Sequence, residues 1–221
     1  QYHAALGESV YLYDPDSALY FFEQGDSIAQ CIPADRRDAN YYLWYAPLLN
    51  NTAFVVQKQG DIVRAVHLYE QCIEAQQASG DSSTIGSSYL NLGNLYSEAG
   101  EADLALEYYG SAKRALPSDD LIGLAHCQNG IGRVFFSQHK YEQALNCYYS
   151  AMSLSDKASM PAGRARSLIN IGQLYFEQKQ LTPALDCFRQ ALEILLANNG
   201  KQGQADCYYY IGEIALRNNQ I

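Results

Sequence analysis

Histidine and cysteine have the widest chemical repertoire of the side chains in this sequence, as metal ligands, general bases or nucleophiles. The four histidines are His3, His67, His126 and His139. No two of them have the spacing of a zinc site. His126 and Cys127 are adjacent, and adjacent side chains on a helix point about 100° apart, so they do not form a base–nucleophile pair on their own. We therefore predict no catalytic residue and no metal site.

Other motifs of enzyme chemistry give the same result. The sequence contains no phosphate-binding loop and no Gly-x-Ser-x-Gly motif. The glycines around Gly130 superficially match a dinucleotide motif, but they lie inside a predicted helix with no strand before it. Acidic pairs such as Asp119 and Asp120 fit helix caps better than a general acid and base. We predict that the protein is not an enzyme and needs no cofactor.

The six cysteines follow a period instead of a ligand pattern. They occupy positions 31, 72, 127, 147, 187 and 207, and no Cys-x-x-Cys pair occurs. Cys127 and Cys207 occupy one position of a repeating pattern, and Cys147 and Cys187 occupy another. Buried cysteine behaves as a small apolar residue. This spacing predicts free thiols packed between the helices of a repeating structure.

The segment Ser88–Ala115 contains the repeating element. Its first part has apolar residues three and four positions apart, which predicts an amphipathic helix. Gly100 ends that helix, and a second apolar stripe runs over 105–112. Pro117 ends the second helix. The segment is therefore predicted to be a helical hairpin.

The same pattern recurs along the chain. Each copy has a glycine and an aromatic residue in its first helix, then an alanine, an aromatic residue and an alanine in its second. The two later copies contain Gly132, Phe135, Ala144, Tyr148 and Ala151, and Gly172, Tyr175, Ala184, Phe188 and Ala191. A weaker copy surrounds Gly60, and a single helix surrounds Gly212. A fixed period of about 40 residues predicts stacked supersecondary units.

This pattern resembles the tetratricopeptide repeat. The matching residues are Tyr89, Leu92, Gly93, Tyr96, Ala105, Tyr109 and Pro117. The period is similar to that of the long repeats in Pins-type adaptors, kinesin light chains and bacterial peptide-pheromone receptors. The resemblance covers roughly 39–219 and implies an all-α fold, a right-handed α-α superhelix built from antiparallel helix pairs.

We predict a single solenoid over residues 1–221. A partial repeat spans 1–38, with a weakly periodic helix before Tyr13 and a second helix that starts at Asp14-Pro15. Full repeats span about 39–78, 83–117, 121–156 and 161–197, and an unpaired helix spans 204–218. Pro47 is expected to delay or kink the helix around it.

Charge and hydropathy limit the partners. The net charge is −9, which disfavours a nucleic-acid partner or an anionic membrane surface. No apolar run is long enough to insert into a membrane. The chain begins at Gln1 instead of Met, so we expect a processed product or an excised fragment. The sequence therefore leaves open whether the protein is cytoplasmic or exported, and it makes no prediction of oligomeric state.

The resemblance implies a peptide-binding site on the concave face of the first helices. Side chains that point away from the packing stripe are candidates, and asparagine recurs among them. The predicted site consists of Asn51, Asn91, Asn94, Asn129, Arg133, Arg166, Asn170 and Gln173. In the resembled families the Asn two before the Gly contacts peptide main chain, which carries over to Asn51, Asn91 and Asn170. Alternatively, these amides are solvated or tie neighbouring helices together.

Two further points of interpretation stay open. Phe136 and Phe176, one repeat apart, fit either ligand contacts or, more naturally, packing between repeats.

The function predicted is a scaffold that binds a protein or peptide ligand in its groove. The alternative is a sensory or ligand-binding repeat domain of a larger bacterial regulator, truncated at both ends.

Overall fold

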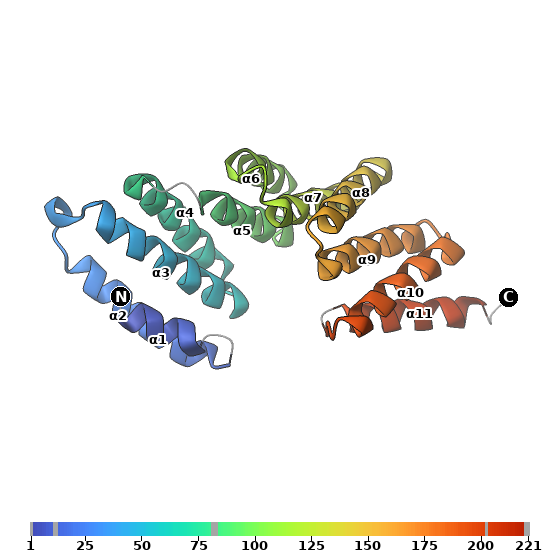
Figure 1. The fold of residues 1–221 in the computed structure, drawn as a ribbon, viewed down its shortest axis with the longest axis horizontal. Coiled ribbons are helices and arrows are strands. Elements are labelled where there is room, and N and C mark those ends of the chain that lie inside the picture. Colours follow the sequence, from blue (N-terminus) through green and yellow to red (C-terminus); the bar gives the residue numbers. More distant parts are fainter. Residues whose placement is uncertain (1, 11–12, 81–83, 202, 219–221) are drawn as a thin grey trace. The chain divides into compact units, whose positions relative to one another are not determined.

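The structure, a computed structural model, describes residues 2–10, 13–80, 84–201 and 203–218. These residues form eleven α-helices, one 3-10 turn and no strand (Figure 1). The helices are α1 (Tyr2–Val10), α2 (Pro15–Gln30), α3 (Ala39–Lys58), α4 (Ile62–Ser79), α5 (Ile85–Glu98), α6 (Ala102–Ala115), α7 (Leu121–Ser137), α8 (Tyr141–Lys157), α9 (Pro161–Glu177), α10 (Leu181–Ala197) and α11 (Gln204–Asn218). The predicted all-α fold class is confirmed.

Aspartate side chains fix the starts of several helices. Each accepts a hydrogen bond from the backbone N–H three residues later, at 2.9 to 3.1 Å, which satisfies a donor that the helix itself leaves open. The caps are Asp14, Asp38, Asp61 and Asp120. The sequence allowed Asp119 or Asp120 before α7, and the structure selects Asp120 because its carboxylate reaches the N–H of Gly123.

Pro47 does not delay α3, contrary to one of the two expectations. The helix begins at Ala39, behind the Asp38 cap, and continues through Pro47 to Lys58. Pro47 is exposed, whereas Leu48 and Leu49 beside it are buried. The lost backbone N–H therefore lies on the solvent side, where water can satisfy the freed carbonyl.

The chain divides into two compact units, and each is described by itself. The first comprises Gln1–Ala99 and Gly110–Leu116, and the second comprises Gly100–Tyr109 and Pro117–Ile221. In the first unit, α1 pairs with α2 and α3 with α4, and α2 packs on α3 and α4 on α5 (Figure 1). One of its apolar clusters joins Ala18 and Phe22 of α2 to Leu48 and Val55 of α3.

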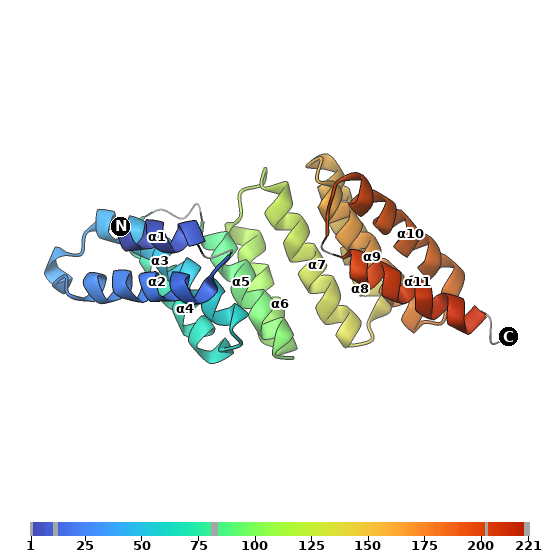
Figure 2. The same ribbon diagram turned by 90° about the horizontal axis from the view of Figure 1, so that it is seen from below.

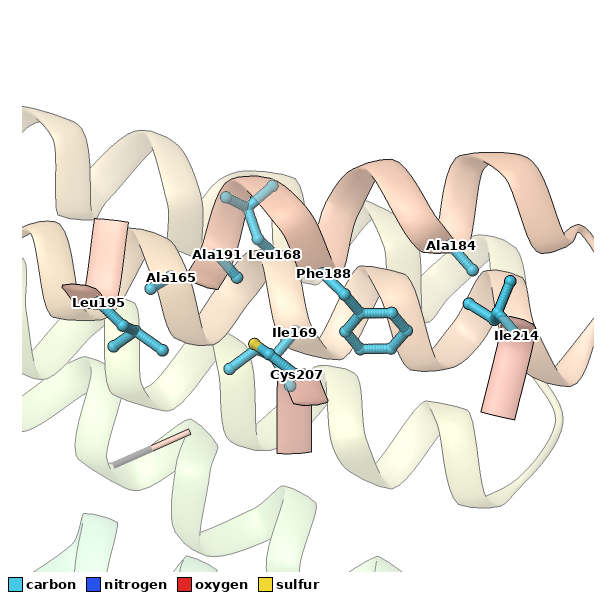
Figure 3. Close-up of a cluster of buried hydrophobic side chains, with 9 residues drawn as sticks. All are labelled: Ala165, Leu168, Ile169, Ala184, Phe188, Ala191, Leu195, Cys207 and Ile214. Carbon is cyan, nitrogen blue, oxygen red and sulfur yellow. The ribbon is translucent and has the colours of Figure 1, made fainter. Parts of the chain in front are cut away.

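The second unit repeats this arrangement. Helix α7 pairs with α8 and α9 with α10, and α8 also packs on α9. Helix α11 lies against α10 and α9, and the three are seen side by side in Figures 1 and 2. A cluster of nine buried residues joins these three helices, with the ring of Phe188 near its middle (Figure 3).

Close helix crossings depend on glycine in the first helix of a pair and an aromatic ring in the second. A Cβ atom added to Gly132 would lie closer than 3.0 Å to the ring of Tyr148, and one added to Gly172 would lie 2.9 Å from Phe188. These two glycines therefore mark close helix crossings. Gly7 and Phe22 form the same contact between α1 and α2, which the sequence pattern had not shown.

Candidate functional site

The predicted site residues come from the first helices of the pairs. Asn51 on α3 and Asn91 and Asn94 on α5 belong to the first unit. The remaining residues belong to the second unit and lie on α7 and α9. They are Asn129, Arg133, Arg166, Asn170 and Gln173. We call the faces formed by α3 and α5, and by α7 and α9, the first-helix surfaces of the two units.

In the first unit, a chain of amide hydrogen bonds crosses three helices. Asn91 donates from Nδ2 to Oδ1 of Asn50 at 3.3 Å. Asn50 donates to Oδ1 of Asn51 at 3.3 Å, and Asn51 donates to Oε1 of Glu8 at 2.9 Å. These three asparagines are partly exposed. A carboxamide has two N–H donors and an acceptor, so this row of amides can also bond to a ligand.

In the second unit, two of the predicted asparagines are buried. Asn129 is 4% exposed and Asn170 is 9% exposed. Asn170 donates from Nδ2 to Oδ1 of Asn129 at 3.1 Å, and Asn129 donates to Oγ of Ser167 at 3.2 Å. The Ser167 hydroxyl also lies 3.2 Å from the carbonyl oxygen of Gly163, to which it can donate. These bonds tie α7 to α9, so the helix-tying alternative accounts for Asn129 and Asn170.

Two arginine side chains are exposed on the helices that form the first-helix surface of the second unit. Arg133 on α7 and Arg166 on α9 are exposed, and neither forms an ion pair with any residue in the described ranges. Partial desolvation of the Arg166 guanidinium by neighbouring protein atoms lowers its pKa, and the nearby charge of Arg133 lowers it further. The pKa of His126 is lowered by burial and by Arg166, against a smaller opposing effect of Asp120. The three side chains therefore share one electrostatic neighbourhood.

Ion-paired arginines elsewhere in the chain show the contrast. Arg64 lies 2.7 Å from Glu23, and Arg164 lies 2.5 Å from Asp156. Arg133 and Arg166, on the contacting helices α7 and α9, instead form no ion pair with any residue of the described ranges. Gln173, on the next turns of α9, is partly exposed and adds an amide to this surface.

Phe136 and Phe176 belong to the packing between helices. Phe136 lies 6.0 Å from the ring of Tyr141, measured between centroids, and contacts the cluster around Tyr148. Phe176 lies 5.2 Å from Tyr210 of α11, and the guanidinium of Arg217 lies 4.2 Å above its ring. The packing interpretation therefore fits both rings.

Gly130 breaks the asparagine pattern for a structural reason. It occupies the position two before the repeat glycine, where Asn91 and Asn170 stand in other copies. A Cβ atom added to Gly130 would lie closer than 3.0 Å to the ring of Tyr109 from α6. The sequence did not identify Ser167 and Glu8 as hydrogen-bond partners of the asparagines. For Ser167 a signal was available, because it shares its repeat position with Cys127, a predicted packing residue between helices.

The described residues offer little for cofactor chemistry. They contain no group of three His, Cys, Asp or Glu side chains that could hold a metal ion. Burial raises the pKa of the Cys187 and Cys207 thiols to about 11, so both are poor nucleophiles at neutral pH. In the same ranges, no helix is both long and apolar enough to cross a bilayer.

Comparison with known proteins agrees with this architecture. The family model for the tetratricopeptide repeat matches residues 44–118 and 123–197, which is more than half of the chain. The chain belongs to the tetratricopeptide repeat family. No curated protein gives a significant match to the full sequence.

Solved structures share the tetratricopeptide fold at low identity. The apo form of RapI has a TM-score of 0.68 at 14% identity and is matched over 95% of this chain and 56% of its own. BtubC from P. vanneervenii has a TM-score of 0.64 at 19% identity and is matched over 92% of this chain and 91% of its own. The Cut9-Hcn1 structure of the APC/C has a TM-score of 0.72 at 20% identity and is matched over 98% of this chain and 36% of its own.

The extent of these matches differs. This chain spans about half of the RapI chain and about a third of the Cut9-Hcn1 match, but nearly the whole of BtubC. At these identities the likeness concerns the fold alone. The chain is therefore a tetratricopeptide repeat scaffold, the type of fold that typically mediates protein interactions.

Proposed function

We propose that this scaffold binds an extended protein or peptide segment on its first-helix surfaces, and that the preferred segment is acidic or neutral. The observation that carries the proposal is the pair Arg133 and Arg166, two neighbouring exposed cations without an ion pair among the described residues. They lie on a chain whose net charge is −9. Two like charges repel, and a bound carboxylate between them would relieve that repulsion.

The buried amide network supports this surface from beneath. The bonds from Asn170 to Asn129 and from Asn129 to Ser167 hold α7 and α9 together, and these helices carry the two arginines. A binding surface built on rigid helices positions its charges better than one built on loops. We therefore assign Asn129 and Asn170 a positioning role in the proposed site.

Partly exposed amides supply the contacts to peptide main chain. Gln173 does so in the second unit, and Asn51, Asn91 and Asn94 do so in the first. A carboxamide offers donors and an acceptor, which matches the N–H and C=O groups of an extended chain. Each unit's surface is proposed as a site in its own right.

A displayed library of short random peptides, selected on the full chain, tests the proposal. The enriched peptides should carry net negative charge. A labelled enriched peptide should then bind about tenfold more weakly to Arg133→Gln/Arg166→Gln than to the unchanged protein, which corresponds to about 1.4 kcal/mol. Raising the salt concentration should weaken binding to the unchanged protein.

The matched control is Arg114→Gln/Arg189→Gln, which makes the same change in net charge at exposed positions on α6 and α10. Binding should survive in this control. Enrichment of basic peptides, or equal loss in both double variants, would reject the proposed site. The alternative of a sensory domain in a larger regulator stays a prediction that the neighbouring coding sequence decides.

A further inference from the structure

An open cavity of about 420 Å³ lies within the second unit, and neither Arg133 nor Arg166 lines it. Its walls come from the C-terminal end of α8 and the turn that follows, from the first turn of α9 and from the C-terminal end of α10. This volume is within the range of small-molecule sites. Charged and apolar side chains both line the cavity, so it suits a small amphipathic molecule.

Ser155 of α8 contributes a buried hydroxyl to this cavity. Its side chain is 0% exposed, and its Oγ atom has no hydrogen-bond partner among the described residues. The hydroxyl lies beside the start of α9, because a Cβ atom added to Gly163 would be 2.5 Å from Oγ. The same added atom would lie closer than 3.0 Å to the terminal methyl group of Met160. A buried hydroxyl without a partner reduces stability, and a ligand that bonds to it recovers that free energy.

The start of α9 adds a second donor. Met160 occupies the N-cap position and forms no side-chain hydrogen bond there, and Pro161 has no N–H. The N–H groups of Gly163 and Arg164 both bond to the carbonyl oxygen of Met160, at 3.1 and 3.2 Å. Within the described ranges, the N–H of Ala162 is left without a partner. The positive end of the helix dipole therefore favours a negative group at this end of the cavity.

The charged side chains of the cavity include one carboxylate in excess. Arg164 pairs with Asp156, and the other N–H donors of its guanidinium stay available. Glu193 is exposed and has no ion-pair partner in the part of the chain that the structure describes. A simple anion would be repelled by Glu193, and a simple cation would leave the donors of Ser155 and α9 without an acceptor. A molecule that carries both charges is complementary to both ends.

We propose that this cavity binds a free α-amino acid with a large apolar side chain. The carboxylate of the amino acid bonds to the Ser155 hydroxyl and to the start of α9, near Arg164, and its ammonium group pairs with Glu193. Its side chain lies against Met160 and Ile194, which are both partly exposed in the cavity wall. The unbranched side chain of Met160 has three rotatable bonds, so it can turn away from Ser155 as the ligand enters.

Isothermal titration calorimetry of the full chain with L-leucine, L-methionine and L-phenylalanine tests the class of ligand. At least one of the three should bind saturably at a single site. The tightest binder is then compared with an analogue that lacks the ammonium group and one that lacks the carboxylate. For L-phenylalanine these are hydrocinnamate and phenethylamine, and each should bind about tenfold more weakly or worse. Failure of all three amino acids to bind, or equal affinity of either analogue, overturns the proposal.

Ser155→Ala tests the buried hydroxyl. It should weaken binding of the amino acid about tenfold. The melting temperature of the free protein should be unchanged or higher, because the lost hydroxyl has no partner among the described residues. Ser153→Ala, at an exposed position of the same helix, is the matched control and should bind normally. Equal binding by the two variants would contradict the assignment, and a lower melting temperature for Ser155→Ala would show a structural role instead.

Glu193→Gln tests the ammonium contact. The amino acid should bind this variant about tenfold more weakly, whereas the analogue without the ammonium group should bind it as well as or better than it binds the unchanged protein. Glu142→Gln, which changes an exposed carboxylate on α8, is the matched control. Equal losses for the amino acid and its analogue would overturn the assignment. Arg133→Gln/Arg166→Gln should bind the amino acid normally, so this site is tested independently of the proposed peptide site.

Discussion

The ring of Tyr148 on α8 lies so close to Gly132 on α7 that no side chain fits between the two helices. Tyr148 is 1% exposed, and it shares a cluster with Ala144, Ile171 and Leu174. The small residue and the large ring are therefore one packing unit. Repetition of that unit at Gly172 and Phe188 stacks the helix pairs of the second unit.

The first prediction is that Gly132→Leu destabilises the fold. The added side chain overpacks the crossing with Tyr148, which should lower the free energy of unfolding by about 1–3 kcal/mol or more. Chemical denaturation measures the change. Gly212→Leu is the matched control, since the same substitution at an open position should leave stability unchanged or raise it by about 0.5–1 kcal/mol. Equal effects of the two changes would mean that the repeat register is wrong.

The second prediction concerns the turn after α9. Lys179 has a φ angle of +60°, which is a left-handed backbone conformation. Gly60 occupies the corresponding turn after α3 and has a φ angle of +89°. The left-handed backbone conformation raises the conformational free energy of a residue with a Cβ atom, whereas glycine adopts it without this penalty. Lys179→Gly should therefore stabilise the protein by about 0.5–1 kcal/mol, after allowance for the more flexible unfolded chain.

Thermal melting measures this gain, and Gly60→Ala supplies the opposite test. A Cβ atom at Gly60 meets nothing within 4 Å of the described structure, so backbone strain is the main effect of the substitution. Its melting temperature should fall. A fall for Lys179→Gly as well would show that the lysine side chain stabilises the turn in another way.

The third prediction separates structural from exposed asparagines. Asn129→Ala removes the acceptor of Asn170 and a donor to Ser167 in a buried site, which should cost about 1–3 kcal/mol of stability. Asn91→Ala breaks one bond of 3.3 Å at a partly exposed site and should cost at most about 1 kcal/mol. Denaturant titration of both variants compares them. A larger loss for Asn91→Ala would reject the role assigned to the buried network.

The fourth prediction is that all six cysteines are free thiols, as the structure has them. Denaturing thiol titration should find six reactive groups per chain. In the folded protein, exposed Cys31 should react first and buried Cys72, Cys127 and Cys207 slowly. Because the pKa of Cys207 is raised to about 11, its reaction rate should keep rising as the pH increases towards that value. A denatured count of four or fewer in protein never exposed to oxidant would indicate a disulfide.

The sequence by itself determined the helices and the way they pair. Apolar spacing of three and four, the aspartate caps and the regular recurrence of Gly132, Gly172 and Gly212 are local or periodic signals. They act through backbone geometry and hydrogen bonds that each segment forms within itself or with the next one. For the same reason, periodicity alone was enough to locate the alanine and aromatic positions of the second helices.

Only the tertiary structure decided which polar residues reach the surface. Asn91 and Asn170 occupy equivalent repeat positions, yet Asn91 is partly exposed and Asn170 is 9% exposed, because burial depends on the side chains of the neighbouring pair. The packing of α7 on α9 likewise brings the helices of Arg133 and Arg166 together, although α8 separates them in the sequence. Periodicity gives the direction of a side chain from its own helix axis, but the packing of other helices determines what that side chain meets.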